Sequence, residues 1–204
     1  MRRHAPWLIA LVAACGSDNC HRPTPLPVSS CISPRSSMPA PAGCSNDGAE
    51  PNDDLPMATA PASGSACGTT ARSGVLAGDG DVDVFRSGDC DLEEVDPSAV
   101  LESSDSLRLC QFLACSHGTT NVFGCYQDAP GDGLVDGGTP RVWKARSESG
   151  FIGCCRNGNG RVSAQVECGG LRLQSVESFV WIDGGDQPLP GRKCPSYSVN
   201  WRVH

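Results

Sequence analysis

The clearest pattern of apolar and polar positions lies at the C-terminal end of the chain, in YSVNWRVH. Every second residue there is apolar and would share one face of an extended strand: Tyr197, Val199, Trp201 and Val203. Successive side chains of a strand point to opposite faces, so this alternation is typical of an antiparallel strand that is buried on one face only. The pattern predicts such a strand over residues 197–204, with Trp201 in a core.

A second alternating stretch follows a clear turn sequence. Residues 156–160, RNGNG, contain two Asn-Gly pairs, which favour the positive φ angles of tight hairpin turns. Beyond the turn, apolar or cysteine side chains again occupy every second position: Val162, Ala164, Val166 and Cys168. The sequence therefore predicts a β-hairpin in which residues 151–155 pair with residues 162–168.

Further short segments have the composition of strands: residues 74–77, 82–86, 107–114, 122–126, 141–145 and 178–182. Clusters of Gly, Pro and Asp separate them, and no window keeps a convincing helical period. Short strands at this spacing predict an all-β fold, either a sandwich or a barrel, and of the two we expect a disulfide-rich antiparallel β-sandwich of the jelly-roll kind. Because aromatic residues make up only 5% of the chain, we expect disulfides to supply part of the stability, at about 2–4 kcal/mol each.

The N-terminal residues have the layout of a secretory signal peptide. Arg2 and Arg3 precede an apolar run over residues 5–14, which is shorter than the roughly 20 residues that a membrane-spanning helix needs. Pro, Ser and small residues then dominate up to about residue 48, without an apolar period. The predicted organisation is a signal peptide over 1–14, a flexible Pro/Ser-rich tether over 15–48 and one β-sandwich domain over 49–204.

The end of the apolar run carries a second signal. Residues 12–15, Val-Ala-Ala-Cys, resemble a bacterial lipobox, in which the cysteine is acylated and becomes the mature N-terminus. The resemblance implies a lipid anchor on Cys15 and a place in the bacterial cell envelope, as an outer-membrane lipoprotein; lipid chains stabilise such an anchor by about 0.8 kcal/mol per buried methylene. The alternatives are ordinary signal cleavage after Ala14, which would release a secreted protein, and a translation start further along the chain.

Cysteine is abundant, with 13 residues in a chain of 204. In an exported chain this density predicts disulfides rather than metal or redox sites, and the number left is even if Cys15 carries lipid. The candidates within the domain are Cys67, Cys90, Cys110, Cys115, Cys125, Cys154, Cys155, Cys168 and Cys194, and bridges among Cys20, Cys31 and Cys44 would pinch the tether into loops.

Strand geometry restricts some of the pairings. Cys154 and Cys155 are neighbours in a predicted strand, so their side chains should point to opposite faces and bond to two different partners. A vicinal disulfide between them is the alternative. Two other bridges are expected from the positions of their cysteines: Cys67–Cys90, which brackets the stretch GDGDVDVF, and Cys168–Cys194, which would tie the last strands together.

The formal net charge of −7 argues against nucleic acid as a partner and disfavours anionic membrane surfaces. It is compatible with divalent cations and with basic or neutral polymers.

Residues for catalysis are few. Among four histidines, only His117 falls inside the domain and away from the chain end, in a predicted turn. The sequence contains no GxSxG, HExxH or phosphate-binding loop, and the cysteine spacings are not those of paired CxxC zinc sites. Acidic pairs such as Asp183 with Asp186 are expected to be solvated loop charges. We therefore expect a protein that is not an enzyme.

The stretch GDGDVDVF, residues 78–85, places Asp79, Asp81 and Asp83 at the spacing of the first half of an EF-hand loop. The second half does not match, because Val84 stands where the loop needs glycine and Cys90 stands where it needs a bidentate glutamate. The stretch instead predicts a turn at residues 78–80 that runs into a strand.

Glu50-Pro51-Asn52-Asp53, followed by residues 74–76 and 80–85, resembles the beginning of bacterial pre-peptidase C-terminal domains, which are β-sandwich modules of secreted proteins. Some members hold calcium between the acidic N-terminal segment and the Asp-containing strand. The resemblance implies that the candidate calcium ligands are Glu50, Asn52, Asp53, Asp81 and Asp83. The alternative is that these Asp and Asn side chains cap turns by bonding to nearby backbone amides.

Together these features predict a lipid-anchored surface protein whose sandwich is a binding or structural module for an extracellular protein or polysaccharide. Exposed aromatic side chains for such binding could come from Trp143, Trp181 and Trp201, although Trp201 also fits the core. One alternative is a small extracellular hydrolase, or its accessory subunit, acting on a polymer. Another is a regulator or inhibitor of a secreted protease.

Overall fold

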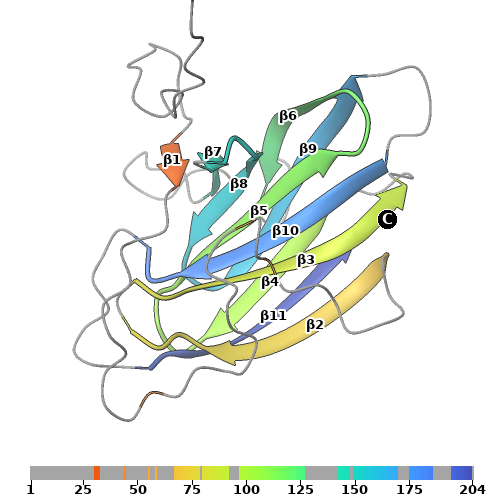
Figure 1. Ribbon diagram of the computed structural model, residues 1–204. Coiled ribbons are helices and arrows are strands. Elements are labelled where there is room, and N and C mark those ends of the chain that lie inside the picture. Colours follow the sequence, from red (N-terminus) through yellow and green to blue (C-terminus); the bar gives the residue numbers. More distant parts are fainter. Residues whose placement is uncertain are drawn as a thin grey trace, which may run out of the picture.

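The strands of the protein form two facing sheets (Figure 1). The computed structural model describes residues 30–32, 44, 55, 58, 67–78, 80–91, 97–126, 142–147, 149–169, 175–185 and 194–203. These residues contain no α-helix, and so none that is long and apolar enough to cross a bilayer. The expected all-β, disulfide-bonded sandwich is confirmed.

The six-stranded sheet has the order β1-β7-β8-β5-β10-β3. Its strands are β1 (Ser30–Ile32), β7 (Val142–Ser147), β8 (Ile152–Asn157), β5 (Arg108–Cys115), β10 (Ser175–Asp183) and β3 (Val82–Asp91). The five-stranded sheet has the order β2-β11-β4-β9-β6. Its strands are β2 (Gly68–Val75), β11 (Ser196–Val203), β4 (Ser98–Ser103), β9 (Gly160–Gly169) and β6 (Thr119–Tyr126). All pairings are antiparallel except that of β1 with β7.

The strand pairs are nested along the chain as in a jelly roll. β3 pairs with β10 and β5 with β8 in one sheet, while β4 pairs with β9 in the other. The innermost pair of this series would be β6 with β7, but β7 lies beside β8 in the six-stranded sheet. Strands that are far apart in sequence are therefore neighbours throughout the fold.

Alternating side chains close the space between the sheets. In β11 the four apolar residues of the alternating face are at most 4% exposed, whereas Asn200 and Arg202 of the other face are exposed. In β9, Val162 and Ala164 are fully buried and lie in the same core. Both expected strands are confirmed, and Trp201 stacks on Phe85 of β3 with ring centroids 6.0 Å apart. β4 was not predicted, although Ala99 and Leu101 alternate within it and are buried.

The expected hairpin across residues 156–160 is wrong. Gly158 and Gly160 do have positive φ angles, 76° and 119°, but β8 pairs with β5 and β7 while β9 pairs with β4 and β6. The connection is an arch from one sheet to the other. Asn159 holds it in place, since its side-chain amide bonds to the backbone N and O of Ser103 at 2.8 and 2.7 Å.

The six-stranded sheet is buried on its outer face as well. Phe112 of β5 and Trp181 of β10 belong to a second apolar cluster on that face, which also contains Ile32, Leu55 and Ala58 from the N-terminal part of the chain. Residues 15–48, expected to be a flexible tether, thus include β1, which adds a strand to this sheet beside β7 (Figure 1). Ile32 and Cys44, which precede position 48, and Leu55 and Ala58, which follow it, therefore all belong to the packed domain.

The structure joins ten of the described cysteines in disulfides. The bonds are Cys44–Cys194, Cys67–Cys90, Cys110–Cys155, Cys115–Cys168 and Cys125–Cys154. The expected Cys67–Cys90 bond is confirmed. The expected Cys168–Cys194 bond is wrong, because Cys168 at the end of β9 reaches across to Cys115 of β5, whereas Cys194 bonds to the N-terminal part of the chain.

Candidate functional site

The candidate calcium ligands divide into two groups. Glu50, Asn52 and Asp53, like the lipidation candidate Cys15, lie outside the described residues. Asp81 lies in the turn before β3, where its carboxylate accepts hydrogen bonds from the backbone N–H groups of Ala77 and Val82. The turn itself is confirmed, with a backbone bond of 3.3 Å from Asp81 N to Gly78 O. Asp81 therefore has the turn-capping contacts that were the alternative to calcium.

The side chain of Asp83, in strand β3, points into the core. It is 1% exposed, and its Oδ2 accepts a hydrogen bond of 2.7 Å from the hydroxyl of Tyr197, which comes from the opposite sheet. The contact links β3 to β11 through the core. Calcium takes six to eight oxygen ligands, and the described part of the chain has no group of three acidic, histidine or cysteine side chains that could hold a metal ion.

The three tryptophans do not form an exposed patch. Trp181 and Trp201 are 1% and 2% exposed, and Trp143 packs against the outer cluster of the six-stranded sheet. An adhesive surface made of these three rings is therefore wrong. Sheet burial on both faces removes Trp181 from solvent, and the alternation of β11 directs Trp201 inward.

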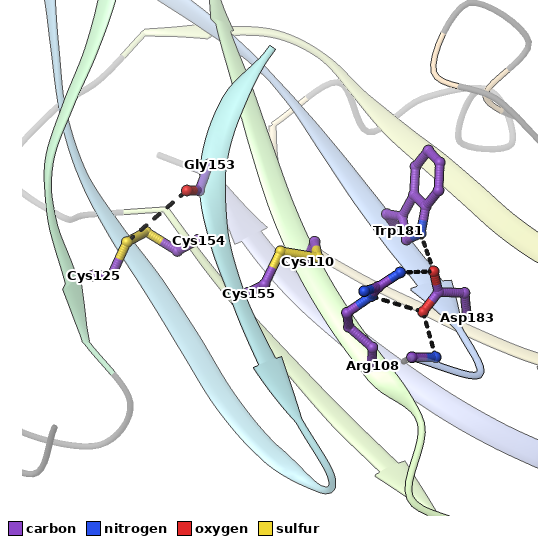
Figure 2. Close-up of a disulfide and its surroundings, with 9 residues drawn as sticks. Arg108, Cys110, Cys125, Gly153, Cys154, Cys155, Trp181 and Asp183 are labelled. Carbon is purple, nitrogen blue, oxygen red and sulfur yellow. Dashed lines mark hydrogen bonds and ion pairs between the residues drawn. A yellow bond between two sulfur atoms is a disulfide. The ribbon is translucent and has the colours of Figure 1, made fainter. Parts of the chain in front are cut away.

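Asp183 is a buried charge rather than the solvated loop charge that was expected. It pairs with Arg108 across β10 and β5, with Oδ1 at 2.9 Å from Arg108 Nε (Figure 2). Trp181 Nε1 and the backbone N–H of Gly185 donate to the same carboxylate at 2.9 and 2.8 Å. With its oxygens bonded to four donors, Asp183 holds the end of β10 and is poorly placed to act as an acid or base.

The described surface is hollowed by a groove of about 350 Å³ at one end of the sandwich. Its residues come from four strands and one turn: Leu113, Ala114, Thr119, Thr120, Arg146, Ser149, Gly150, Phe151 and Ile152. β5 and β8 place Leu113 directly beside Ile152, and β7 places Arg146 on the other side of Ile152. The groove thus lies between the β5–β6 turn and the β7–β8 turn.

Local contacts hold both walls of the groove. In the β7–β8 turn, Phe151 N donates to Ser147 Oγ at 3.0 Å and Ser147 N donates to Phe151 O at 2.9 Å. The ring of Phe151 packs on Phe179 with centroids 4.9 Å apart. On the opposite wall, Cys115 N donates to Thr120 Oγ1 at 2.9 Å. The wall residues are therefore positioned by the fold before any ligand arrives.

The groove combines an apolar floor with a small set of polar groups. Its apolar lining residues are Leu113, which is itself buried, Ala114, Phe151 and Ile152, and threonine and serine residues complete the lining. Arg146 is the one charged side chain among these lining residues. This composition is typical of small-molecule sites, in which a few polar groups orient a ligand on an apolar surface. His117 is exposed in the adjacent β5–β6 turn and does not line the groove.

The sequence did not reveal this groove, because its residues are brought together only by the pairing of β5, β7 and β8. Comparisons with protein-family models, with curated proteins and with solved structures find no match for the chain. The class of the protein is therefore defined by its fold, a disulfide-bonded, two-sheet β-sandwich with a groove at one end.

Proposed function

We propose that the protein is an exported, lipid-anchored β-sandwich of the bacterial cell envelope, and that it acts as a binding module rather than as an enzyme. The disulfides support export, because such bonds form and persist in oxidising compartments. The lipobox-like residues 12–15 support the anchor. Residues 50–53 and the GDGDVDVF stretch resemble segments of sandwich modules found on secreted proteins, which also supports a location outside the cytosol.

The observation that supports the binding role is the contrast between a filled interior and a groove that opens at one end of the sandwich. The space between the sheets is packed with buried apolar side chains, and the described residues that line the groove include one ionisable side chain, Arg146. Acid–base catalysis needs titratable groups within reach of the reacting atoms. The groove instead combines apolar residues, hydroxyl-bearing residues and one cation, a composition that favours binding over hydrolysis.

Three disulfides support this role by linking the two sheets, namely Cys67–Cys90, Cys115–Cys168 and Cys125–Cys154. Each such bond typically adds about 2–4 kcal/mol of stability. Cross-links of this kind keep the ends of the sandwich, including the groove walls, in one arrangement outside the cell. A rigid scaffold of this kind binds with little loss of conformational entropy.

Export and anchoring are tested by the intact mass of membrane-extracted protein before and after reduction and alkylation. We expect a mature chain that begins at Cys15, carries the mass of acyl chains, and gains alkyl groups only after reduction. Cys15→Ser should release the protein from the membrane fraction. A full-length, thiol-rich cytosolic protein would overturn the proposal.

The binding role is tested separately by incubating the purified protein with acidic and neutral polysaccharides. We expect no release of reducing ends from either polymer, and retention of the protein on at least one of them. Sustained release of reducing ends that survives repurification would assign the protein to the hydrolases instead.

A further inference from the structure

We propose that the groove between the β5–β6 and β7–β8 turns is a saccharide site that takes a carboxylate-bearing sugar unit, with Arg146 on the carboxylate and its register partner Ile152 against the sugar ring. This inference rests on the proposed binding role and names its ligand class. The proposal follows from the charge, the surface chemistry and the rigidity of the groove.

Charge is the first argument. The chain as a whole is acidic, with a formal net charge of −7, yet among the described residues that line the groove the one charged side chain is the cation Arg146. Lys144 lies two residues earlier in β7 and therefore on the same face of that strand. Within the described residues, neither side chain takes part in an ion pair. Two cations that have no ion pair with another described residue, beside a groove in an acidic protein, favour an anionic ligand.

The guanidinium group of Arg146 indicates which kind of anion would bind in the groove. Arginine presents a planar fork of donors that matches the two oxygens of a carboxylate, and such bidentate pairs are among the strongest hydrogen-bonded contacts in proteins. Arg146 is half-buried at the groove wall and forms a register pair with Ile152 of β8. A ligand carboxylate bound there would therefore place the rest of the ligand over the apolar floor.

The floor and the hydroxyls fit a sugar ring. A pyranose has a face of C–H groups that packs on apolar and aromatic side chains, and hydroxyls at its rim that need both donors and acceptors. Ile152, which packs against the edge of the inner core, provides apolar surface, and Thr119, Thr120 and Ser149 also line the groove. Because Thr120 Oγ1 already accepts a bond from Cys115 N, its O–H remains available as a donor to a ligand oxygen.

The size and rigidity of the groove also fit a short saccharide unit. Its volume of about 350 Å³ lies near the lower end of the range of about 300–1,000 Å³ that is usual for small-ligand sites. The Cys115–Cys168 disulfide joins the two sheets directly beside Ala114, and Thr120 is the register partner of Cys168. One wall is therefore covalently fixed, which lowers the entropy cost of ordering the site around a ligand.

The test is a titration of the whole mature protein with short oligogalacturonates, followed by calorimetry or by chemical-shift changes in NMR spectra. We expect saturable binding that weakens as salt is added, because the main contact is between charges. Arg146→Gln should weaken binding at least tenfold, and Lys144→Gln should weaken it less, since Lys144 does not line the groove. Chemical-shift changes should include Thr120 and Phe151.

Arg202→Gln is the matched control. Arg202 is an exposed arginine of β11 on the solvent side of the five-stranded sheet, and it has no ion pair within the described residues. Its substitution removes the same charge from the protein and should leave the affinity unchanged. Equal losses for Arg146→Gln and Arg202→Gln would show attraction by net charge only and would overturn the site.

Two further probes separate the ligand classes. A neutral oligosaccharide of the same length should bind at least tenfold more weakly, and a short glutamate peptide should bind more weakly than the oligogalacturonate. Tighter binding of the peptide would overturn the saccharide assignment, as would the absence of oligogalacturonate binding. Neither result would affect the proposed binding role, which fails only if the protein degrades a polymer or is retained on none.

Discussion

Cys154 and Cys155 are adjacent in β8, and their disulfides leave the strand on opposite faces (Figure 2). Cys154 crosses the core to Cys125 of the five-stranded sheet, while Cys155 bonds to its register partner Cys110 in the neighbouring strand β5. The pair thus gives β8 one bond between the sheets and one within a sheet. Two different partners were expected from the alternation of side chains, and the vicinal alternative is wrong.

The disulfides differ in how deeply they are buried, and this difference predicts the order in which a reductant opens them in the folded protein. A mild thiol reductant should open Cys44–Cys194 before Cys110–Cys155, because exchange requires the attacking thiolate to reach a disulfide sulfur. Cys110 and Cys155 are fully buried, whereas Cys44 and Cys194 are half-buried. Timed alkylation followed by mass spectrometry of peptides measures the order. In denaturant the two bonds should open at similar rates, and native labelling of Cys110 first would contradict the prediction.

Leu55 lies outside all the strands that the sequence predicts, yet we expect its substitution to lower the stability of the protein strongly. Leu55 is 2% exposed and lies in the outer apolar cluster. Leu55→Ala should lower the free energy of unfolding by about 2–5 kcal/mol, the usual range for a buried leucine. Val100→Ala is the control, because Val100 is only half-buried, and it should cost no more than about 1 kcal/mol. Urea unfolding followed by tryptophan fluorescence gives both values; equal small losses would mean that Leu55 does not hold the sheet.

The alternation of apolar and polar side chains allows some of the strands to be predicted from the sequence. Strands buried on one face, such as β11 and β9, alternate strictly and were predicted within a few residues of their ends. β10 is buried on both faces, so its alternation is lost and only part of it was found. β1 has three residues and is held by pairing with β7, which no local pattern encodes.

Pairing was the part of the fold that sequence could not supply. Turn chemistry at residues 156–160 determines the φ angles of Gly158 and Gly160, but it does not determine whether the two strands stay in one sheet. The same limit applies to Cys168, whose partner depends on which strand ends meet. It applies to the groove as well, since Leu113 and Arg146 meet Ile152 only through strand register.

The two fully buried tryptophans differ in their indole N–H groups, which predicts unequal effects of the same substitution. Trp181 Nε1 donates to Asp183 at 2.9 Å, whereas Trp201 Nε1 has no hydrogen-bond partner among the described residues. Trp181→Phe should therefore lower the free energy of unfolding by about 1–3 kcal/mol more than Trp201→Phe, because it leaves a buried carboxylate with one donor fewer. Chemical denaturation of both variants measures the difference. Equal costs would mean that loss of ring volume decides the outcome in both.

The hydroxyl of Tyr197 is predicted to contribute more than that of Tyr126. Tyr197 donates to the buried carboxylate of Asp83 across the sheets, and Tyr126 donates to Gln165 at 3.0 Å from a half-buried position. Tyr197→Phe should cost about 1.5–3 kcal/mol, the range for bonds to charged groups, and Tyr126→Phe no more than about 1 kcal/mol. Thermal and urea unfolding of the two variants tests this. A Tyr197→Phe variant as stable as the parent would show that Asp83 is satisfied by its other contacts.

Calcium is predicted to have little effect on thermal unfolding. The carboxylate of Asp81 bonds to the backbone N–H groups of Ala77 and Val82, and that of Asp83 bonds to Tyr197, so both are already stabilised by protein groups. The midpoint should therefore agree to within about 1 °C in excess calcium and in excess chelator. A ligand present at 100 times its Kd stabilises a protein by about 2.7 kcal/mol, which corresponds to roughly 5–10 °C for a chain of this size.

A midpoint that stays constant is easily distinguished from one that rises by several degrees. The variant Asp81→Asn then shows whether the carboxylate of Asp81 binds calcium or caps the turn. Asparagine keeps one acceptor for the turn but loses the charge that calcium requires. If calcium raises the midpoint by several degrees and Asp81→Asn abolishes that rise, Asp81 is a ligand of the ion, as the family resemblance implies. If the midpoint stays constant in both chains while Asp81→Asn lowers it by a similar amount with and without calcium, Asp81 acts only as the cap of the turn before β3.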